Sequence, residues 1–270
     1  PEQYVSGAKI PAVLLCHGFA GIKDFLLPAY AEAFAAAGFA ALTFDYRGFG
    51  ASEGERGRLN PTEQIIDIRN AITFLQTLPE VDPERIGLWG SSFGGANIIG
   101  TAAIDHRPRC LVAQLTFADG ERMILGKLEA GEREKIVNTL KKASERQVLK
   151  NKTLSLTPDQ ILTDAESKDF FKKALETYPA LQTKIPLLTL QWIIEFHPEE
   201  LIRKIKRPIL IISAENDLVC PAAESERLYE QANQPKELMV LKNTKHYDVY
   251  SGAPFSQSSR KAVDWFQRYL

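Results

Sequence analysis

A serine framed by glycines two residues away on either side is the strongest chemical signal in this sequence. The pentapeptide at 90–94, Gly-Ser-Ser-Phe-Gly, follows an apolar segment that predicts a strand and precedes residues 96–99, which predict a helix. On such a turn the serine is strained and its hydroxyl faces a cleft, while the glycines let strand and helix pass closely. The pattern nominates Ser92 as a nucleophile. Ser91 is the alternative, but it lacks glycines at these offsets.

A serine hydroxyl needs an adjacent base, and the base needs a carboxylate to orient it. The sequence holds four histidines: His17, His106, His197 and His246. His246 follows the strand-like segment 237–241 and lies in a loop near the end of the chain, where a catalytic base is expected. His106 fits a polar turn and His197 precedes an expected helix. We therefore predict that His246 is the base.

The orienting carboxylate is expected after the apolar segment 208–213, which predicts a strand and leads into Ala-Glu-Asn-Asp at 214–217. Asp217 has the better offset for reaching His246. Glu215 is the runner-up, and its ordinary interpretation is a solvated turn carboxylate. The order along the chain is then Ser92, Asp217, His246.

The carboxyl ends of parallel strands meet at one edge of a sheet, and ligands bind there. Ser92, Asp217, His246 and the loop that begins at His17 each follow a different predicted strand. Four candidate site elements are therefore expected to converge on one edge, which random placement of these residue types would not produce.

The elements that would position them alternate along the chain. Strands are expected near 11–16, 39–45, 85–90, 110–117, 208–213 and 237–242, and helices near 24–37, 61–77, 93–104, 222–232 and 257–269. Pro61 suits the first turn of its helix, with Asn60 as the N-cap. Such alternation predicts an α/β fold with a doubly wound, mostly parallel sheet.

The alternation stops between residues 119 and 206, where charged segments with helical periodicity replace strand patterns. We expect a helical cap at 119–206, inserted between two parts of the core, 1–118 and 207–270. The apolar stretch around Trp192 and Phe196 packs within the cap or against the body in the simpler interpretation. In the other, Trp192 and Phe196, together with Phe170 and Phe171, roof a substrate pocket.

Composition excludes several classes of function. A net charge of −1 and a pI near 6.6 do not indicate binding to nucleic acid or to an anionic membrane. No apolar run approaches the roughly 20 residues of a membrane span. Three cysteines are too few for a disulfide framework, which favours a cytoplasmic location. No metal-binding spacing and no dinucleotide-binding turn occurs, so we expect no metal and no cofactor.

The chain resembles the α/β-hydrolase superfamily. The matching segments are Cys16-His17-Gly18-Phe19, Asp-Tyr-Arg-Gly-Phe-Gly-Ala-Ser at 45–52, the glycine-serine turn at 87–95, Glu215-Asn216-Asp217, and Lys-His-Tyr-Asp at 245–248. Within the superfamily, the double serine, the double glycine and the His-Gly-Phe loop look like the dienelactone-hydrolase and X-Pro-dipeptidyl-peptidase-like branch, which includes fungal polyketide transferases. Members usually carry a hairpin before the first strand; here it is missing or reduced to residues 3–5, which suggests that the natural start lies upstream.

The resemblance implies further roles. Two backbone N–H groups stabilise the oxyanion in this family, and they correspond here to those of Phe19 and Phe93. The side chain of Phe19 would line the pocket, and His17 would shape its loop without transferring protons.

The expected activity is that of a serine hydrolase acting on a carboxylic ester of a small, apolar substrate. The alternative is an acyltransferase of the polyketide-transferase kind, and a peptidase, a thioesterase or a non-enzymatic ligand receptor would use the same fold. The expected partner is a small-molecule acyl substrate, with no nucleic acid and no membrane, and the apolar cap leaves room for a homodimer.

Overall fold

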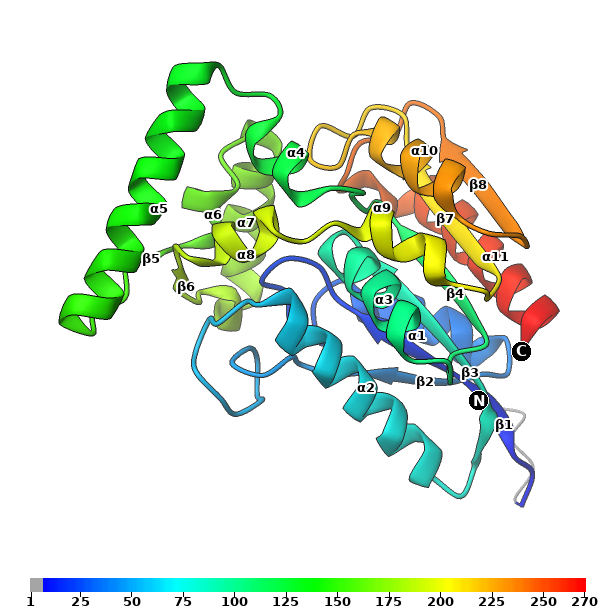
Figure 1. Ribbon diagram of the computed structural model, residues 1–270. Helices are drawn as coiled ribbons and strands as arrows, with labels where there is room; N and C mark the ends of the chain where they lie inside the picture. The colour runs from blue at the N-terminus through cyan, green and yellow to red at the C-terminus, as the bar shows by residue number, and fades with distance from the viewer. Residues whose placement is uncertain (1–6) are drawn as a thin grey trace.

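A parallel sheet of six strands forms the centre of the computed structural model, which describes residues 7–270 (Figure 1). The strands are β1 (Ile10–Cys16), β2 (Ala40–Thr43), β3 (Val81–Ser91), β4 (Cys110–Gln114), β7 (Ile209–Ala214) and β8 (Lys236–Leu241). They lie in the order β2-β1-β3-β4-β7-β8, and every neighbouring pair is parallel. The predicted fold class is confirmed. The expected remnant of a hairpin at residues 3–5 lies outside the described residues.

Helices cover both faces of this sheet. One face packs on α1 (Leu27–Ala36) and α11 (Gly252–Tyr269), and the other on α2 (Pro61–Thr77), α3 (Phe93–Ile104) and α10 (Ala222–Gln231). Because both faces are buried, the central strands are nearly continuous runs of apolar residues, as parallel sheets require. The doubly wound arrangement leaves the carboxyl ends of the strands free to carry a site.

Local sequence explains most helix starts. The side chain of Asn60 accepts hydrogen bonds from the N–H groups of Thr62 and Glu63, and Pro61 takes the first helical position of α2, as predicted. Helix α1 begins later than expected, because Leu26 has a positive φ of 67° that ends the preceding loop. Helix α11 begins five residues earlier than predicted, directly after Ser251.

The chain between β4 and β7 forms an insertion rich in helices. Its elements are α4 (Gly120–Leu125), α5 (Ala130–Lys150), β5 (Ser155–Leu156), α6 (Pro158–Ile161), α7 (Ala165–Thr177), η1 (Pro179–Leu181), β6 (Ile185–Pro186), α8 (Thr189–Ile194), α9 (Pro198–Leu201) and η2 (Ile202–Lys204). The short antiparallel pair β5–β6 is a departure from the expected all-helical segment. Figure 1 shows that α5 projects away from the sheet.

A buried carboxylate ties both ends of the insertion to the core. Glu224 on α10 accepts hydrogen bonds from the backbone N–H groups of Ala118 and Asp119, where the chain leaves the core. It also pairs with Arg122, whose guanidinium bonds Glu199 at the returning end. The first and last parts of the insertion are therefore held to the core by the same carboxylate, that of Glu224.

We expect Glu224→Gln to lower the free energy of unfolding by about 2–3 kcal/mol, since it removes the charge from a buried, multiply bonded carboxylate. Glu226→Gln, on an exposed position of the same helix, is the matched control and should change stability by less than about 0.5 kcal/mol. Urea unfolding measures both. Equal stability of the two variants would show that Glu224 does not anchor the insertion.

Candidate active site

Ser92 occupies the sharp turn between β3 and α3. Its φ is +55°, an uncommon conformation for a residue with a side chain, and its N–H donates to the carbonyl oxygen of Gln114 at 2.8 Å. A Cβ at Gly90 would overlap the carbonyl oxygen of Gly94, and one at Gly94 would overlap that of Cys16. The glycines are therefore required by close backbone contacts, and the turn presents the serine outward.

The predicted carboxylate and histidine meet at the same edge of the sheet. Asp217 Oδ2 lies 2.7 Å from His246 Nδ1, and the side chains are 0% and 2% exposed, respectively. The other oxygen of Asp217 accepts hydrogen bonds from the N–H groups of Val219 and Cys220, which fix the carboxylate. This geometry directs Nε2 of His246 away from Asp217.

Glu215, the alternative carboxylate, faces elsewhere. It is exposed, its Oε1 pairs with Lys242 Nζ at 2.9 Å, and its Oε2 accepts the N–H of Asn243. Of the two candidates, Asp217 is the one that contacts His246.

The remaining histidines occupy other surroundings. His197 Nδ1 lies 2.7 Å from Asp119 Oδ2 at the base of the insertion. The carbonyl oxygen of His106 accepts a hydrogen bond from Arg207 in a surface loop. Neither histidine is among the described residues that line the cavity containing Ser92.

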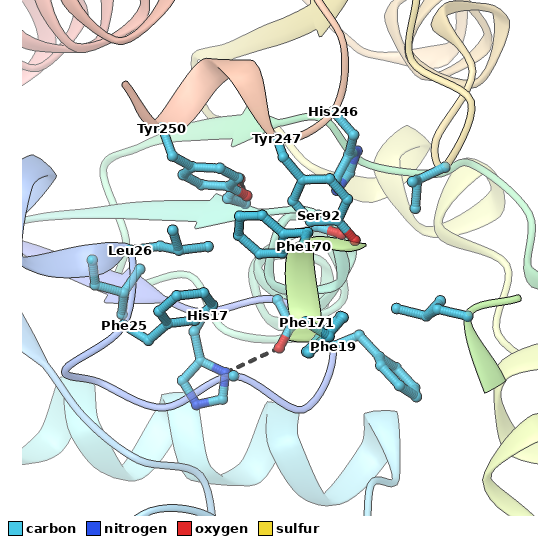
Figure 2. Close-up of a pocket in the computed structure, with 16 residues that line it drawn as sticks. His17, Phe19, Phe25, Leu26, Ser92, Phe170, Phe171, His246, Tyr247 and Tyr250 are labelled. Carbon is cyan, nitrogen blue, oxygen red and sulfur yellow. Dashed lines mark hydrogen bonds between the residues drawn. The ribbon is translucent and has the colours of Figure 1, made fainter. Parts of the chain in front are cut away.

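Ser92 and His246 line a common cavity of about 70 Å³ (Figure 2). Its walls are mostly aromatic and aliphatic and come from the His17 loop, the insertion and the loop after β8. The lining residues include Phe19, Phe25, Leu26, Leu162, Phe170, Phe171, Val219, Tyr247 and Tyr250. Known ligand pockets typically measure about 300–1,000 Å³, so this cavity by itself holds no more than a short acyl group.

An aromatic stack closes one side of the cavity. The rings of Phe170 on α7 and Tyr247 are stacked with centroids 3.8 Å apart and an interplanar angle of 19°. The Tyr247 hydroxyl lies 2.9 Å from Ser167 Oγ. The same two rings line a hollow on the outer surface, so the stack forms a wall between the cavity and that hollow. The insertion thus contacts the loop that carries His246.

The structure places Trp192 and Phe196 elsewhere than the pocket expected for them. Trp192 lies under the guanidinium of Arg58, 4.8 Å from the ring centroid, and Phe196 packs in the core beside Phe117. Neither is among the described residues that line the cavity. Both side chains join the insertion to the body, which was the simpler of the two expectations, whereas Phe170 and Phe171 do line the cavity.

Phe19 and Phe93, whose backbone N–H groups are expected to bind an oxyanion, lie near each other. Phe93 is the first residue of α3, where an N–H has no partner within the helix. The rings of Phe19 and Phe93 are 6.3 Å apart, and a Cβ at Gly18 would lie 3.1 Å from that of Ser92. Among the described residues, the N–H groups of Phe19 and Phe93 find no protein acceptor. That these two groups bind an oxyanion stays a prediction.

His17 is buried beneath the cavity. Its Nδ1 lies 3.0 Å from the carbonyl oxygen of Gly18, and its ring meets that of Tyr46 edge-on at 4.6 Å. Burial lowers the pKa of His17 to about 4, against the smaller opposing effects of the Gly18 hydrogen bond and the Asp45 charge. The imidazole is therefore neutral near pH 7.

This lowered pKa makes His17 a source of acid instability. The unfolded chain takes up a proton near pH 6.5, whereas the folded chain takes it up only near pH 4. The contribution of this group is therefore complete above pH 6.5 and is lost as pH falls toward 4, with a slope of at most about 1.4 kcal/mol per pH unit. Urea titrations at pH 7, 6, 5 and 4 give the free energy of unfolding at each pH. We expect this free energy to fall less steeply with decreasing pH in His17→Gln than in the wild type. Parallel pH dependences would contradict this assignment.

Cys220 is a neighbour of the nucleophile that the sequence did not single out. Burial, reinforced by the Asp217 carboxylate, raises the pKa of this thiol well above its usual range, against a lesser contribution from Ser92. The thiol stays protonated and does not compete with Ser92. The sequence also did not identify four other residues that line the cavity: Phe25, Leu162, Tyr247 and Tyr250. Of these, only Tyr247 could have been suspected, because it directly follows His246.

No described helix is long and apolar enough to cross a membrane. Among residues 7–270, no group of three or more histidine, cysteine or acidic side chains is arranged to hold a metal ion.

Comparisons with known proteins agree with this architecture. The chain is 42% identical over 263 residues to an uncharacterized 31.7 kDa protein from the traX–finO intergenic region of Escherichia coli, covering 97% of this chain and 92% of that one. It is 30% identical to thiohydrolase aneE of Aspergillus aculeatus, over 99% of this chain and 88% of the relative. Relatives of lower identity include proteins named polyketide transferase and quorum-quenching protein.

Among solved structures, that of DcsB in complex with its substrate analogue superposes with a TM-score of 0.86 at 25% identity, covering 97% of this chain and 92% of that one. The likeness to polyketide transferases expected from the sequence is confirmed. The model of one family, described as serine aminopeptidase S33, matches residues 8–248. With its parallel sheet and its glycine-framed serine, the chain belongs to this family of α/β-hydrolases.

Proposed function

We propose that this protein is a serine hydrolase that cleaves an ester or related acyl bond of a small, apolar substrate. The observation that carries the proposal is the buried Asp217–His246 hydrogen bond, in the cavity where the strained turn presents Ser92. The hydrolase family and the thiohydrolase relatives support hydrolysis of an acyl bond. Ester and serine specificity are our inference from the site.

In the proposed reaction, the hydroxyl of Ser92 attacks the carbonyl carbon and transfers its proton to Nε2 of His246. Asp217 holds the imidazole in the required tautomer, and the N–H groups of Phe19 and Phe93 stabilise the developing oxyanion. The bond to the leaving group breaks as His246 returns the proton to it. Water then attacks the acyl-enzyme, again with His246 as base, which releases the acid and restores Ser92.

The residues that line the cavity indicate which charge a substrate can carry. No described residue that lines the cavity is an aspartate, a glutamate, a lysine or an arginine. A buried ammonium or carboxylate without a partner is costly, because desolvation is not compensated. This favours an uncharged acyl group and disfavours the free ammonium of an aminopeptidase substrate.

Acyl transfer is the second candidate. Relatives named polyketide transferase and acyltransferase support it, as does a small apolar cavity with the Phe170–Tyr247 stack as one wall. Deacylation by an alcohol or amine would then replace hydrolysis. We propose a cytoplasmic location on the basis of three free, buried cysteines, and a homodimer stays a prediction.

A p-nitrophenyl ester series from acetate to decanoate tests the proposed function. We expect saturable turnover that peaks at a short acyl chain, because the cavity is small. Added alcohol or amine separates the candidates: an acyltransferase forms the new ester or amide in preference to the free acid. Absence of turnover with every ester and acceptor would contradict both.

We expect Phe170→Ala to shift the preferred acyl chain toward longer esters, because it removes one ring of the stack that closes the cavity. Relative kcat/KM for octanoate over acetate should rise about tenfold, the equivalent of one or two more buried methylenes. Phe74→Ala, an exposed phenylalanine on α2, is the matched control and should leave the ratio unchanged. An unaltered ratio in Phe170→Ala would mean that the stack does not limit the acyl site.

A further inference from the structure

A buried polar network lies directly behind the nucleophile and is used by none of the steps above. Its members come from separate elements of the core: Tyr30 on α1, Ser91 at the end of β3, Gln114 at the end of β4, Tyr250 in η3 (Asp248–Tyr250) and Ser258 on α11. Tyr30, Ser91, Gln114 and Ser258 are at most 2% exposed. Burial of so many polar groups is favourable only if each is paired.

Gln114 joins the network to the turn that carries Ser92. Its carbonyl oxygen accepts the N–H of Ser92 at 2.8 Å, and its side-chain amide donates to Ser91 Oγ at 3.2 Å. Its Oε1 lies 3.1 Å from the Tyr30 hydroxyl. One residue thus holds the backbone of the nucleophile and the side chain beside it.

Tyr250 joins the network to the loop that carries His246. Its hydroxyl lies 2.7 Å from Ser91 Oγ, and its ring lines the cavity (Figure 2). The Tyr30 hydroxyl also lies 3.0 Å from the carbonyl oxygen of the buried Val249. Tyr250 follows His246 by four positions, and it ends the short turn η3, which begins at Asp248. We therefore expect a shift of Tyr250 to be passed on to His246.

We propose that the hydrogen bond between Ser91 and Tyr250 sets the position of His246 relative to Ser92, so that both are positioning residues for acyl transfer. The inference rests on the proposed function. Ser92 and His246 come from distant parts of the chain, and the bond from Ser91 to Tyr250 spans 159 positions between the same two segments. An error of about 1 Å between nucleophile and base is enough to slow an enzyme about a hundredfold.

The test is a double-mutant cycle of Tyr250→Phe, Ser91→Ala and the combination. Tyr250→Phe keeps the ring that lines the cavity and removes only the hydroxyl. We expect each single change to lower kcat about tenfold with KM within about twofold, and the double variant to be no worse than Ser91→Ala alone, since both remove one interaction. Tyr269→Phe, on α11 outside the network, is the control and should match the wild type.

The rate at which a fluorophosphonate labels Ser92 gives a second readout that does not depend on the choice of substrate. It should fall with kcat in Tyr250→Phe while the thermal midpoint stays well above the assay temperature. Labelling and kcat equal to wild type in Tyr250→Phe, or single effects that multiply in the double variant, would overturn the inference. If the fluorophosphonate did not label the wild type at all, that result would instead contradict the proposed function.

Discussion

Replacement of Ser92 by alanine is expected to lower kcat/KM for p-nitrophenyl esters by about four to six orders of magnitude, as removal of a catalytic serine does in other hydrolases. No other described residue combines a hydroxyl with this turn and with a place beside His246 in the cavity. The fold should persist, because alanine can keep the backbone hydrogen bond to Gln114.

The control for this variant is Ser256→Ala, an exposed serine on α11, which should retain wild-type activity. Thermal midpoints of Ser92→Ala and wild type should agree within a few degrees. Activity of Ser92→Ala within tenfold of wild type, at equal stability, would exclude Ser92 as the nucleophile.

Asp217→Asn is expected to have the second largest effect, a loss of about three to four orders of magnitude in kcat. The amide keeps the size of the side chain but can no longer hold the imidazole with its Nε2 free to accept a proton. Glu215→Gln provides a matched comparison from the same loop, and since Glu215 is exposed and bound to Lys242, its variant should remain within about twofold of wild type. If Glu215→Gln were the more damaging change, the carboxylate would be misassigned.

The core of the site could be predicted because its signals are local. The glycines around Ser92 are required by backbone contacts within a few residues and with the adjacent strand, so they leave a fixed pattern in the sequence. Asp217 and His246 follow their strands at short offsets, and a parallel sheet brings such positions to one edge. The parallel topology of the sheet therefore accounts for how these residues come together.

The walls of the cavity depend on packing between segments that are far apart in the chain. Trp192 and Phe170 are both aromatic residues in helical segments of the insertion, and only the way the insertion folds onto the core decides which faces Ser92. Trp192 meets Arg58 of the core, whereas Phe170 stacks on Tyr247. Sequence periodicity distinguishes a buried face from an exposed one, but it does not name the partner.

Polar contacts within the core were missed for a related reason. Gln114 lies within the predicted strand 110–117 and Glu224 within the predicted helix 222–232, and nothing in either pattern singled them out. Their roles depend on partners more than 80 positions away, Tyr30 for Gln114 and Arg122 for Glu224. Buried polar networks of this kind are defined by register between elements, which no single segment of the sequence encodes.

The most direct test of Ser92 as the nucleophile is to react the protein with a fluorophosphonate and to locate the adduct by mass spectrometry of its peptides. We expect a single adduct on Ser92, formed much more slowly in Asp217→Asn and absent in Ser92→Ala. An adduct on Ser91 or any other residue, or no adduct at all in the wild type, would contradict the assignment of Ser92 as an activated nucleophile.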